Sequence, residues 1–330
     1  MAERAFAWVQ ASLHNDELTF QPLKAEASHR AFYRVQPATA GAAAPGSAVL
    51  MVSPPDKEQN AQFERLARIF ADSGLPVPTI LDLQPEHGWY LLTDLGPRDL
   101  ASLYGTPDEE AALQLAITTL IRLQQVRDHA IPPYTAQRFT DELGIFSEWF
   151  VHGLLDESLP GAVASIFGAL VERTRNQPQC CVHRDYHCRN LLYDPTDRRL
   201  GIVDFQDALV GPASYDLASL LHDCYHEFTS AEIGRWTDFY LDRTSLDLDR
   251  STFKEDLDYI AVQRQLKAIG IFVRLRLRDQ KRTHLPYIPP VLDHLIGLTR
   301  RHEALSPLAR WLEDLDRDRI ADRLVGLAAR

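Results

Sequence analysis

The sequence predicts an α+β fold of two lobes, a small antiparallel-sheet lobe followed by a larger, mainly helical lobe. At 330 residues the chain is longer than one typical core requires. Short β-prone runs gather near the N-terminus, whereas apolar residues recur at a spacing near 3.6 through the rest. We place the lobes at residues 1–95 and 96–330, with a hinge near 93–96.

The first lobe is expected to contain two helices and four strands. An amphipathic helix is predicted over residues 6–13, and a second over 57–73, where Gly74 follows as a helix-ending residue. The segment 37–47 is rich in Ala, Gly and Pro and is typical of a loop between strands. Aromatic and β-branched runs predict strands over residues 31–35, 48–52, 78–83 and 89–93.

The second lobe reads as a series of amphipathic helices. The predicted helices cover about 108–126, 138–156, 160–175, 214–225, 230–244, 252–278 and 290–303. Two short hairpin strands, around 190–193 and 200–204, interrupt this series. No internal repeat stands out in the chain.

Composition and charge exclude several classes of protein. The formal net charge is −11, which argues against a nucleic-acid-binding surface. No signal-peptide pattern and no stretch of roughly 20 apolar residues is present, so we expect a cytoplasmic protein without a membrane partner. The four cysteines form neither a CxxC pair nor a disulfide pattern. The sequence leaves the oligomeric state open, with a monomer as the working expectation.

The segment 183–190 (HRDYHCRN), followed by the strand-ending segment 202–205 (IVDF), has the residue types that phosphoryl transfer requires. Asp185 is a candidate acceptor for the proton of the attacking hydroxyl. Asn190 and Asp204 offer oxygen ligands for the Mg²⁺ that bridges the phosphates. The expected cofactors are therefore ATP and Mg²⁺, although a loop Asp or Asn commonly makes only local turns.

The stretch after Asp204 favours a small acceptor over a protein substrate. Only twelve positions separate Asp204 from Asp216, and no Ala-Pro-Glu sequence follows. This leaves no room for the long segment with which protein kinases bind peptides. Gln206 stands where glycine usually follows Asp-Phe, which removes backbone freedom at that position.

These motifs resemble the aminoglycoside phosphotransferase superfamily of small-molecule kinases, which has a bilobal protein-kinase-like fold. The segments that carry this resemblance are 183–190, 202–205 and 215–218. Other segments resemble the bacterial cell-wall amino-sugar kinases, which phosphorylate the anomeric C1 hydroxyl of N-acetylmuramate and N-acetylglucosamine. These segments are 204–208 (DFQDA), 91–96 (LLTDLG) and 263–275 (QRQLKAIGIFVRL).

The resemblance assigns roles to several residues of these motifs in this chain. It implies that Asp185 is the catalytic base and that Asn190 and Asp204 hold the metal ion. It also implies that Asp216 is a buried support for the catalytic loop, to which His183 belongs. The partners would be a nucleotide and a small sugar, and the product would enter peptidoglycan recycling.

The nucleotide-binding residues are less clearly marked. The loop 27–32 takes the place of a glycine-rich phosphate loop but contains no glycine, which leaves Ser28 and Arg30 as candidate phosphate contacts or as parts of an exposed turn. Met51 lies near the position of the usual phosphate-binding lysine, so Arg30 or Lys57 would have to supply the cation.

The segment Thr93-Asp94-Leu95 resembles the hinge that reads the adenine base through backbone groups. Beyond the hinge, Asp207 follows the metal-ligand candidate by three residues. It could assist metal or substrate, or cap the following turn.

The candidate acceptor elements are residues 134–149 and the basic helix 264–282. Glu148 and Trp149 combine hydrogen bonding with an aromatic face, as sugar sites do, although Trp149 also fits a core position. A cationic stripe that includes Arg274 would suit the lactyl carboxylate of N-acetylmuramate, or it pairs with acidic neighbours. The stripe consists of Arg264, Lys267, Ile271, Arg274 and Arg278.

Other acceptors remain open from the sequence alone. The superfamily also includes kinases for aminoglycosides, choline, homoserine and methylthioribose. A catalytically silent, kinase-like nucleotide-binding module is the non-enzymatic alternative. Met51 and the glycine-free loop favour that module, whereas the intact Asp185, Asn190 and Asp204 oppose it.

Overall fold

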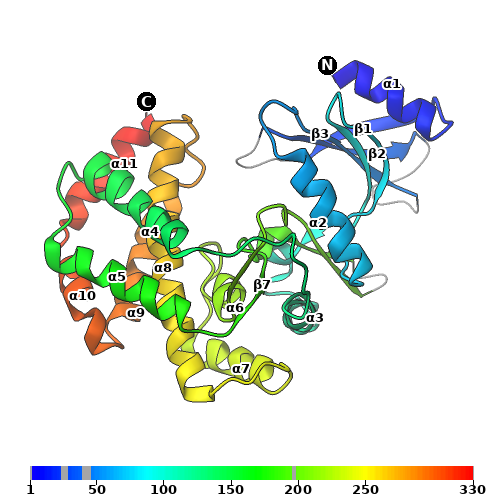
Figure 1. Cartoon of the computed structure of the whole chain (residues 1–330). Coiled ribbons are helices and arrows are strands. Elements are labelled where there is room, and N and C mark those ends of the chain that lie inside the picture. Colours follow the sequence, from blue (N-terminus) through cyan, green and yellow to red (C-terminus); the bar gives the residue numbers. More distant parts are fainter. Residues whose placement is uncertain (1, 24–28, 39–45, 195–197, 330) are drawn as a thin grey trace. The chain divides into compact units, whose positions relative to one another are not determined.

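A computed structural model describes residues 2–23, 29–38, 46–194 and 198–329 of the chain (Figure 1). The chain divides into two compact units, Met1–Ile131 with Cys188–Ala208, and Pro132–His187 with Leu209–Arg330. It therefore crosses from one unit to the other three times. The lobe boundary expected at residues 93–96 remains a prediction.

The first unit is built on an antiparallel sheet of five strands in the order β1-β2-β3-β5-β4. The helices α1 (Ala2–Ser12) and α2 (Asn60–Asp72) accompany it. The strands are β1 (Leu18–Leu23), β2 (Ala31–Pro37), β3 (Ala48–Val52), β4 (Ile80–Gln84) and β5 (Trp89–Thr93).

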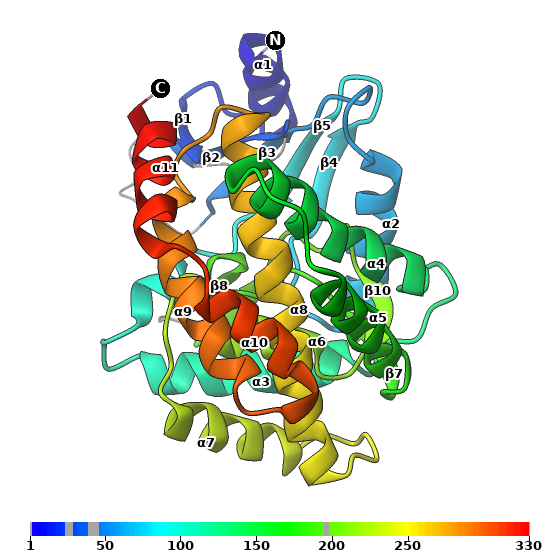
Figure 2. The same cartoon turned by 90° about the vertical axis from the view of Figure 1, so that its left-hand side faces the viewer.

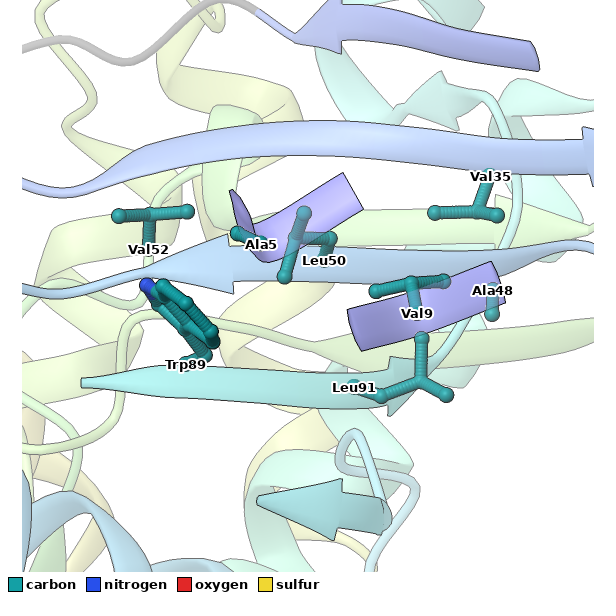
Figure 3. Close-up of a cluster of buried hydrophobic side chains, with 8 residues drawn as sticks. All are labelled: Ala5, Val9, Val35, Ala48, Leu50, Val52, Trp89 and Leu91. Carbon is teal, nitrogen blue, oxygen red and sulfur yellow. The ribbon is translucent and has the colours of Figure 1, made fainter. Parts of the chain in front are cut away.

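Helix α1 covers one face of this sheet, and the side chains meet there in a closed apolar cluster (Figure 3). Ala5 and Val9 of α1 are fully buried in it. Strand residues alternate between the two faces, so every second residue of β3 and β5 points to α1. The strand members of the cluster are Val35, Ala48, Leu50, Val52, Trp89 and Leu91.

The intervening residues of β3 and β5 form the opposite face, against which α2 packs. Met51 is 1 % exposed and is paired in register with Tyr90. The Tyr90 ring meets the edge of the Phe63 ring of α2 at 5.7 Å between centroids. Its hydroxyl donates a hydrogen bond of 2.7 Å to Glu64, so a polar contact also joins α2 to the sheet.

A second, three-stranded sheet of the first unit has the order β6-β8-β9. It brings the segment after the hinge beside the hairpin that follows the HRDYHCRN motif. Asp99 caps the short helix η1 by accepting a hydrogen bond from the Ser102 backbone N–H. The elements are β6 (Arg98–Asp99), η1 (Leu100–Leu103), α3 (Glu109–Leu123), η3 (Cys188–Asn190), β8 (Leu191–Asp194) and β9 (Arg199–Ile202).

The second unit is mainly helical and is organised around the long helix α8 (Arg250–Leu277), which contacts α4, η2, α5, α6 and α9 (Figure 2). The other elements are α4 (Ala136–Ile145), η2 (Phe146–Leu154), α5 (Gly161–Arg175), β7 (Gln179–Val182), β10 (Leu209–Pro212), α6 (Tyr215–Leu221), α7 (Ser230–Leu241), η4 (Leu285–Tyr287), α9 (Ile288–Thr299), η5 (Glu303–Leu305), α10 (Ser306–Glu313) and α11 (Arg317–Ala329).

Helix α8 approaches the backbone of its neighbour closely at Gly270. A Cβ atom at this position would lie 2.6 Å from the carbonyl oxygen of Ile145, closer than real side chains come. At this point α4 continues into the π-helix η2, which starts at Phe146. π-helical turns of this kind are frequent at functional sites.

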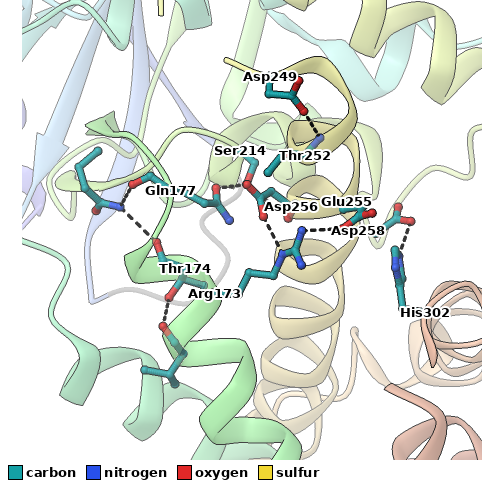
Figure 4. Close-up of polar contacts among 12 residues, drawn as sticks. Arg173, Thr174, Gln177, Ser214, Asp249, Thr252, Glu255, Asp256, Asp258 and His302 are labelled. Atoms are coloured by element: carbon teal, nitrogen blue, oxygen red, sulfur yellow. Dashed lines mark hydrogen bonds and ion pairs between the residues drawn. The ribbon is translucent and has the colours of Figure 1, made fainter. Parts of the chain in front are cut away.

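Polar contacts join α5 to the N-terminal half of α8 (Figure 4). Arg173 donates hydrogen bonds to Asp256 at 2.7 Å and to Glu255 at 2.8 Å. Ser214, which directly precedes α6, donates to Gln177 at 2.6 Å and is fully buried. The start of α6 is therefore held by buried polar groups.

The predicted fold class is confirmed, since an antiparallel sheet dominates the N-terminal region and helices dominate the C-terminal part. Several short elements were not predicted, namely β1, β6, β7, β10, α10 and α11. The single helix predicted over 138–156 is two segments, α4 and the π-helix η2. No helix in the described part of the chain is both long and apolar enough to cross a membrane.

Candidate active site

The segment with Asp185 follows β7 in the second unit. β7 pairs antiparallel with β10, with Val182 opposite Leu209. The next two residues are held by Asp216 at the start of α6, whose carboxylate accepts the backbone N–H groups of His183 at 2.6 Å and Arg184 at 3.0 Å. Arg184 has a φ of 78°, a strained value for a residue with a side chain. Asp216 thus fixes an unusual backbone directly before Asp185.

Asp185 lies among cations of its own unit. Burial by itself would raise the pKa of its carboxyl group, but Lys267 and Arg264 of α8, together with His187 and Arg184, lower that pKa to about 2. The Asp185 backbone N–H also donates to Nδ1 of the buried His183, at 3.3 Å. At neutral pH, Asp185 is therefore an ionised and oriented acceptor.

The cations around Asp185 are themselves held by Glu142 of α4, which is 6 % exposed. Glu142 accepts a hydrogen bond from Arg184 and pairs with Lys267 at 3.2 Å. Tyr134 and Gln263 also donate to it. Although burial raises the pKa of Glu142, these cations lower it overall, so the carboxylate remains charged. Glu142 therefore holds the cations that surround Asp185 in the second unit.

Sequence reasoning missed Glu142, although it considered the segment that contains it. The available signal was an acidic residue on the apolar face of a helix, between Phe139 and Phe146 at spacings of three and four. A carboxylate at such a position is buried and needs cationic partners. Two of those partners are Lys267, from the predicted stripe, and Arg184, from the motif.

Burial raises the pKa of Asp216 to about 7, and nearby Asp185 acts in the same direction. The two backbone N–H donors and Arg264 favour the charged form and oppose that rise. Arg264 also donates to the carbonyl oxygen of Arg184 at 2.6 Å. Side chains therefore hold both backbone groups of Arg184, its N–H through Asp216 and its carbonyl oxygen through Arg264.

The two candidate metal ligands lie together in the first unit, at the open end of the β8–β9 hairpin. The register pairs Leu191 with Ile202, and the backbone N–H of Val203 donates to the carbonyl oxygen of Asn190 at 3.1 Å. Asp204 is the next residue, and it is exposed. Amide and carboxylate oxygens are the ligands that Mg²⁺ prefers, so this pair fits the expected ion.

The Asp204 backbone has a φ of 66°, a left-handed conformation that costs energy for a residue with a side chain. The next residue, Phe205, is 1 % exposed and packs between two rings of α2. It stacks on Phe63 at 5.5 Å and meets the edge of Phe70 at 5.6 Å. An apolar anchor therefore holds the strained turn. Gln206 donates to the Asp204 carboxylate at 2.7 Å.

The residues expected at the phosphates are only partly described. Ser28 lies outside the described residues. Arg30 is buried at the start of β2, where it donates to Ser53 at 3.2 Å and pairs with Glu58 at 3.6 Å. Lys57, the other candidate cation, is exposed. A contact of Arg30 or Lys57 with a nucleotide remains a prediction.

The expected hinge is a tightly bonded turn. Arg34 of β2 pairs with Asp94 at 2.6 Å and donates to the carbonyl oxygen of Gly96 at 2.9 Å. Although burial raises the pKa of Asp94, Arg34 lowers it overall. Thr93 pairs with Thr79 through its backbone N–H and its hydroxyl oxygen. The side chains of Thr93 and Asp94 thus brace the turn.

The remaining hinge candidate, Leu95, packs on β9. A Cβ atom at Gly201 would lie 2.6 Å from a methyl carbon of Leu95, so only glycine fits beneath that side chain. Leu95 therefore ties the hinge to the β8–β9 hairpin of the same unit. Asp207, which lies three residues after Asp204, is exposed.

Among the candidate acceptor residues of the second unit, Arg274 has its pKa influenced by several neighbours. Burial lowers the pKa of Arg274, Arg278 lowers it further, and Asp279 and Glu148 raise it. The buried Nε atom of Arg274 has no hydrogen-bond partner among the described residues. Glu148 is exposed and Trp149 is half-buried, and both lie in the π-helix η2.

The rest of the cationic stripe is engaged in other contacts. Lys267 pairs with Glu142, and Arg278 pairs with Asp279 at 2.8 Å. Arg264 lies over the Tyr215 ring at 4.8 Å. Pairing with acidic neighbours therefore accounts for part of the stripe, whereas the Nε atom of Arg274 has no such partner among the described residues.

A family model described as "Phosphotransferase enzyme family" matches residues 19–251 of this chain. A protein of Neisseria meningitidis named N-acetylmuramate/N-acetylglucosamine kinase is 31 % identical over 93 % of this chain and 94 % of its own. A protein of Pseudomonas aeruginosa with the same name is 30 % identical over 89 % of this chain and 88 % of its own.

Solved structures share the fold at low sequence identity. A choline/ethanolamine kinase family protein from Mesorhizobium loti has a TM-score of 0.62 at 14 % identity and covers 88 % of this chain and 92 % of its own. An ADP-bound aminoglycoside phosphotransferase has a TM-score of 0.58 at 14 % identity, covering 88 % of this chain and 97 % of its own. Both similarities concern the fold.

Proposed function

The chain belongs to the phosphotransferase enzyme family, and we propose that it transfers the γ-phosphoryl group of ATP to the anomeric C1 hydroxyl of N-acetylmuramate and N-acetylglucosamine. The relatives that carry this name match nearly the whole chain, which supports the same acceptor here. We further propose that it acts in the cytoplasm, in the recycling of cell-wall sugars.

The observation that carries this proposal is the ionised Asp185 beside Lys267 and Arg264. Asp185 would accept a hydrogen bond from the C1 hydroxyl and so orient its oxygen toward the γ-phosphorus. A carboxylate with a pKa of about 2 is a weak base, so it takes the proton late, as the oxygen–phosphorus bond forms. An anomeric hydroxyl is more acidic than an ordinary alcohol, which suits such a base.

Asn190 and Asp204 are the residues that would hold Mg²⁺. Bound there, the ion would neutralise charge on the phosphate chain, the main electrostatic need of this reaction. The left-handed turn at Asp204 and the anchoring of Phe205 keep the carboxylate at the end of the hairpin. Arg30 and the backbone of the hinge, 93–95, are our candidates for the nucleotide.

Arg274 is our candidate for the lactyl carboxylate that distinguishes N-acetylmuramate from N-acetylglucosamine. Its buried Nε atom offers a donor, and charge-assisted bonds to a carboxylate are strong. Arg274 would repel a polycationic aminoglycoside, which favours an acidic or neutral sugar over the antibiotic as acceptor. Lys267, by contrast, is already paired with Glu142.

A coupled ADP-release assay with Mg²⁺-ATP tests the acceptor, with N-acetylmuramate, N-acetylglucosamine, choline and kanamycin compared side by side. We expect turnover with both acetylated sugars and a product that has lost its reducing end. Turnover with kanamycin or choline alone would overturn the proposal and assign a different acceptor class.

Replacement of Asp185 by Asn tests the proposed base. We expect kcat to fall about 100-fold to 10,000-fold, with nucleotide affinity retained, because the amide cannot accept the proton. Unchanged turnover in this variant would remove Asp185 from the mechanism, whatever the acceptor proves to be.

A further inference from the structure

A chain of aromatic rings in the second unit starts beside Asp185. The His187 ring, two residues after Asp185, lies 5.5 Å from the Tyr225 ring between centroids. The Tyr225 ring lies 5.1 Å from that of Tyr287, in an edge-to-face arrangement. His187 is also one of the groups that act electrostatically on Asp185. The rings of His187, Tyr225 and Tyr287 are termed the aromatic rim below.

The aromatic rim rests on a buried base. Phe272 of α8 is 5 % exposed, and its ring stacks on His284 at 5.2 Å and lies 6.2 Å from Tyr287. Phe272 is five residues beyond Lys267 on the same helix, which corresponds to about 7.5 Å along its axis. The rim therefore extends from the Asp185 loop toward the C-terminal half of α8, on a different face of that helix from Arg274, which follows Phe272 by two residues, or about 200° of rotation.

All three rings of the aromatic rim remain partly exposed, although their supports are buried. The other aromatic cluster close to the Asp185 loop differs in this respect, because Tyr134, Phe139 and Tyr215 are buried. Rings that keep accessible area beside a catalytic carboxylate can serve an incoming molecule. Aromatic faces bind the C–H face of a pyranose ring, which is apolar.

We propose that Tyr225 and Tyr287 are acceptor-specificity residues that hold the pyranose ring of the sugar, with its C1 hydroxyl directed to Asp185. This inference rests on the proposed function, since it assumes an acetylated sugar as the acceptor. In this arrangement the rings bind the sugar's apolar face, while the cations of α8 face its polar groups. His187, whose ring contacts that of Tyr225, follows Asp185 by two residues and so connects the rim to the Asp185 loop.

Steady-state kinetics of Tyr225→Leu and Tyr287→Leu test the proposal, with Tyr→Phe at each position and Phe239→Leu as a matched control. Phe239 is a partly exposed aromatic residue of α7 that packs against Arg243. Each Leu variant is expected to raise KM for N-acetylglucosamine about tenfold, the equivalent of a lost contact of roughly 1.4 kcal/mol. KM for ATP stays unchanged, and the Phe variants and the control behave like the wild type.

Saturation-transfer NMR provides a readout that does not depend on turnover. Irradiation of aromatic protons should transfer signal to ring protons of N-acetylglucosamine in the wild type, and the transfer should fall in both Leu variants. Thermal melting identifies a variant that has failed to fold, in which case the Tyr→Met variant at that position, which also lacks an aromatic ring, takes its place.

The outcomes separate this inference from the function on which it rests. Unchanged KM and unchanged transfer in folded Leu variants of an active sugar kinase would overturn the role of the rim and leave the function intact. A wild type that turns over only choline, with choline KM raised in the Leu variants, would overturn both the sugar acceptor and the proposed stacking on a pyranose.

Discussion

The two candidate halves of the catalytic machinery are anchored by opposite kinds of chemistry. In the second unit, polar groups hold the Asp185 loop, through Asp216 on its backbone and Glu142 on its cations. In the first unit, an apolar side chain holds the Asp204 turn, with Phe205 clamped between two rings of α2. Both anchors stabilise a residue with positive φ, Arg184 in one case and Asp204 in the other.

A strained backbone turn can therefore be stabilised in two ways. Buried polar contacts are directional and depend on the charge state of their members. Packed rings are insensitive to pH but sensitive to lost volume. We therefore expect the Asp185 loop to respond to pH and charge, and the Asp204 turn to respond to side-chain size.

The largest effect is expected from removing the apolar anchor. Phe205→Ala should lower the free energy of unfolding by about 4 kcal/mol, because it leaves a cavity between Phe63 and Phe70. The loss should be the same at pH 6 and pH 8, as measured by urea denaturation. Phe205→Leu is the control, with a loss of less than about 1.5 kcal/mol expected. A strongly pH-dependent loss of stability in the Ala variant would contradict the expectation that the Asp204 turn is insensitive to pH.

The next effect concerns the charged centre of the polar anchor. Glu142→Gln should cost about 3 kcal/mol of stability, because it leaves Arg184 and Lys267 buried without their carboxylate. The neighbouring Asp141 is exposed and bonds only to Gln137 among the contacts described, so Asp141→Asn should change stability by less than about 0.5 kcal/mol. Equal losses in the two variants would argue against Glu142 as an organising charge.

A smaller effect on stability, but a clear one on turnover, is expected from Asp216→Asn. An amide oxygen replaces two carboxylate oxygens, so one of the two backbone N–H groups loses its acceptor. The resulting displacement of Asp185 should lower kcat about 100-fold, with KM for ATP unchanged. A variant with the wild-type kcat would show that the loop needs no such support.

The Asp216→Asn variant also tests the direction in which the contribution of Asp216 to stability changes with pH. The Asp216 pKa is about 7 in the folded protein and 3.8 in an ordinary Asp, so between these values the folded state binds a proton that the unfolded state lacks. The stability that this group contributes is present at low pH and is lost as pH rises toward 7. The melting temperature of the wild type relative to Asp216→Asn should therefore be higher at pH 5 than at pH 8.

The smallest effect is expected from a buried histidine pair in the same unit. His222 and His294 lie 3.1 Å apart between ring nitrogens, and burial lowers the pKa of both. The folded state stays neutral where unfolded histidine takes up a proton, so stability falls as pH drops below about 6.5. His294→Gln should weaken this acid loss in melting experiments. If the melting temperature of the variant falls with pH as much as that of the wild type, the histidine pair is not the cause of the loss of stability in acid.

The sequence was sufficient for the parts of the fold with strong local patterns. The motif 183–190 and the segment 202–205 predict a hairpin with Asn190 and Asp204 at one end, and the register brings them there. The family resemblance is confirmed by the family model and by the named relatives. Short apolar runs and residue order carry this information directly.

Other features of the fold and of the candidate site could not be predicted, because they depend on weak local patterns or on contacts between residues far apart in the sequence. β1 lies at the sheet edge, has no fully buried residue and contains Pro22, which argues against a strand inside a sheet. β7 and β10 have four residues each, too few for a clear period. Glu142 acquires its importance from Lys267, which is 125 positions away in the sequence. Tyr225 and Tyr287 likewise meet only in the folded chain.

The close approach at Gly270 has a consequence for how such an enzyme could change its substrate. This glycine lets α8 lie against the backbone of Ile145 and Phe146, four residues before Arg274 on α8 and three residues before Glu148 on the neighbouring segment. A single added methyl group would have to push the two helices apart, because the atoms in its way are backbone. Gly270 is therefore a position at which a wider helix crossing would shift the proposed acceptor residues, and a library restricted to those residues would omit it.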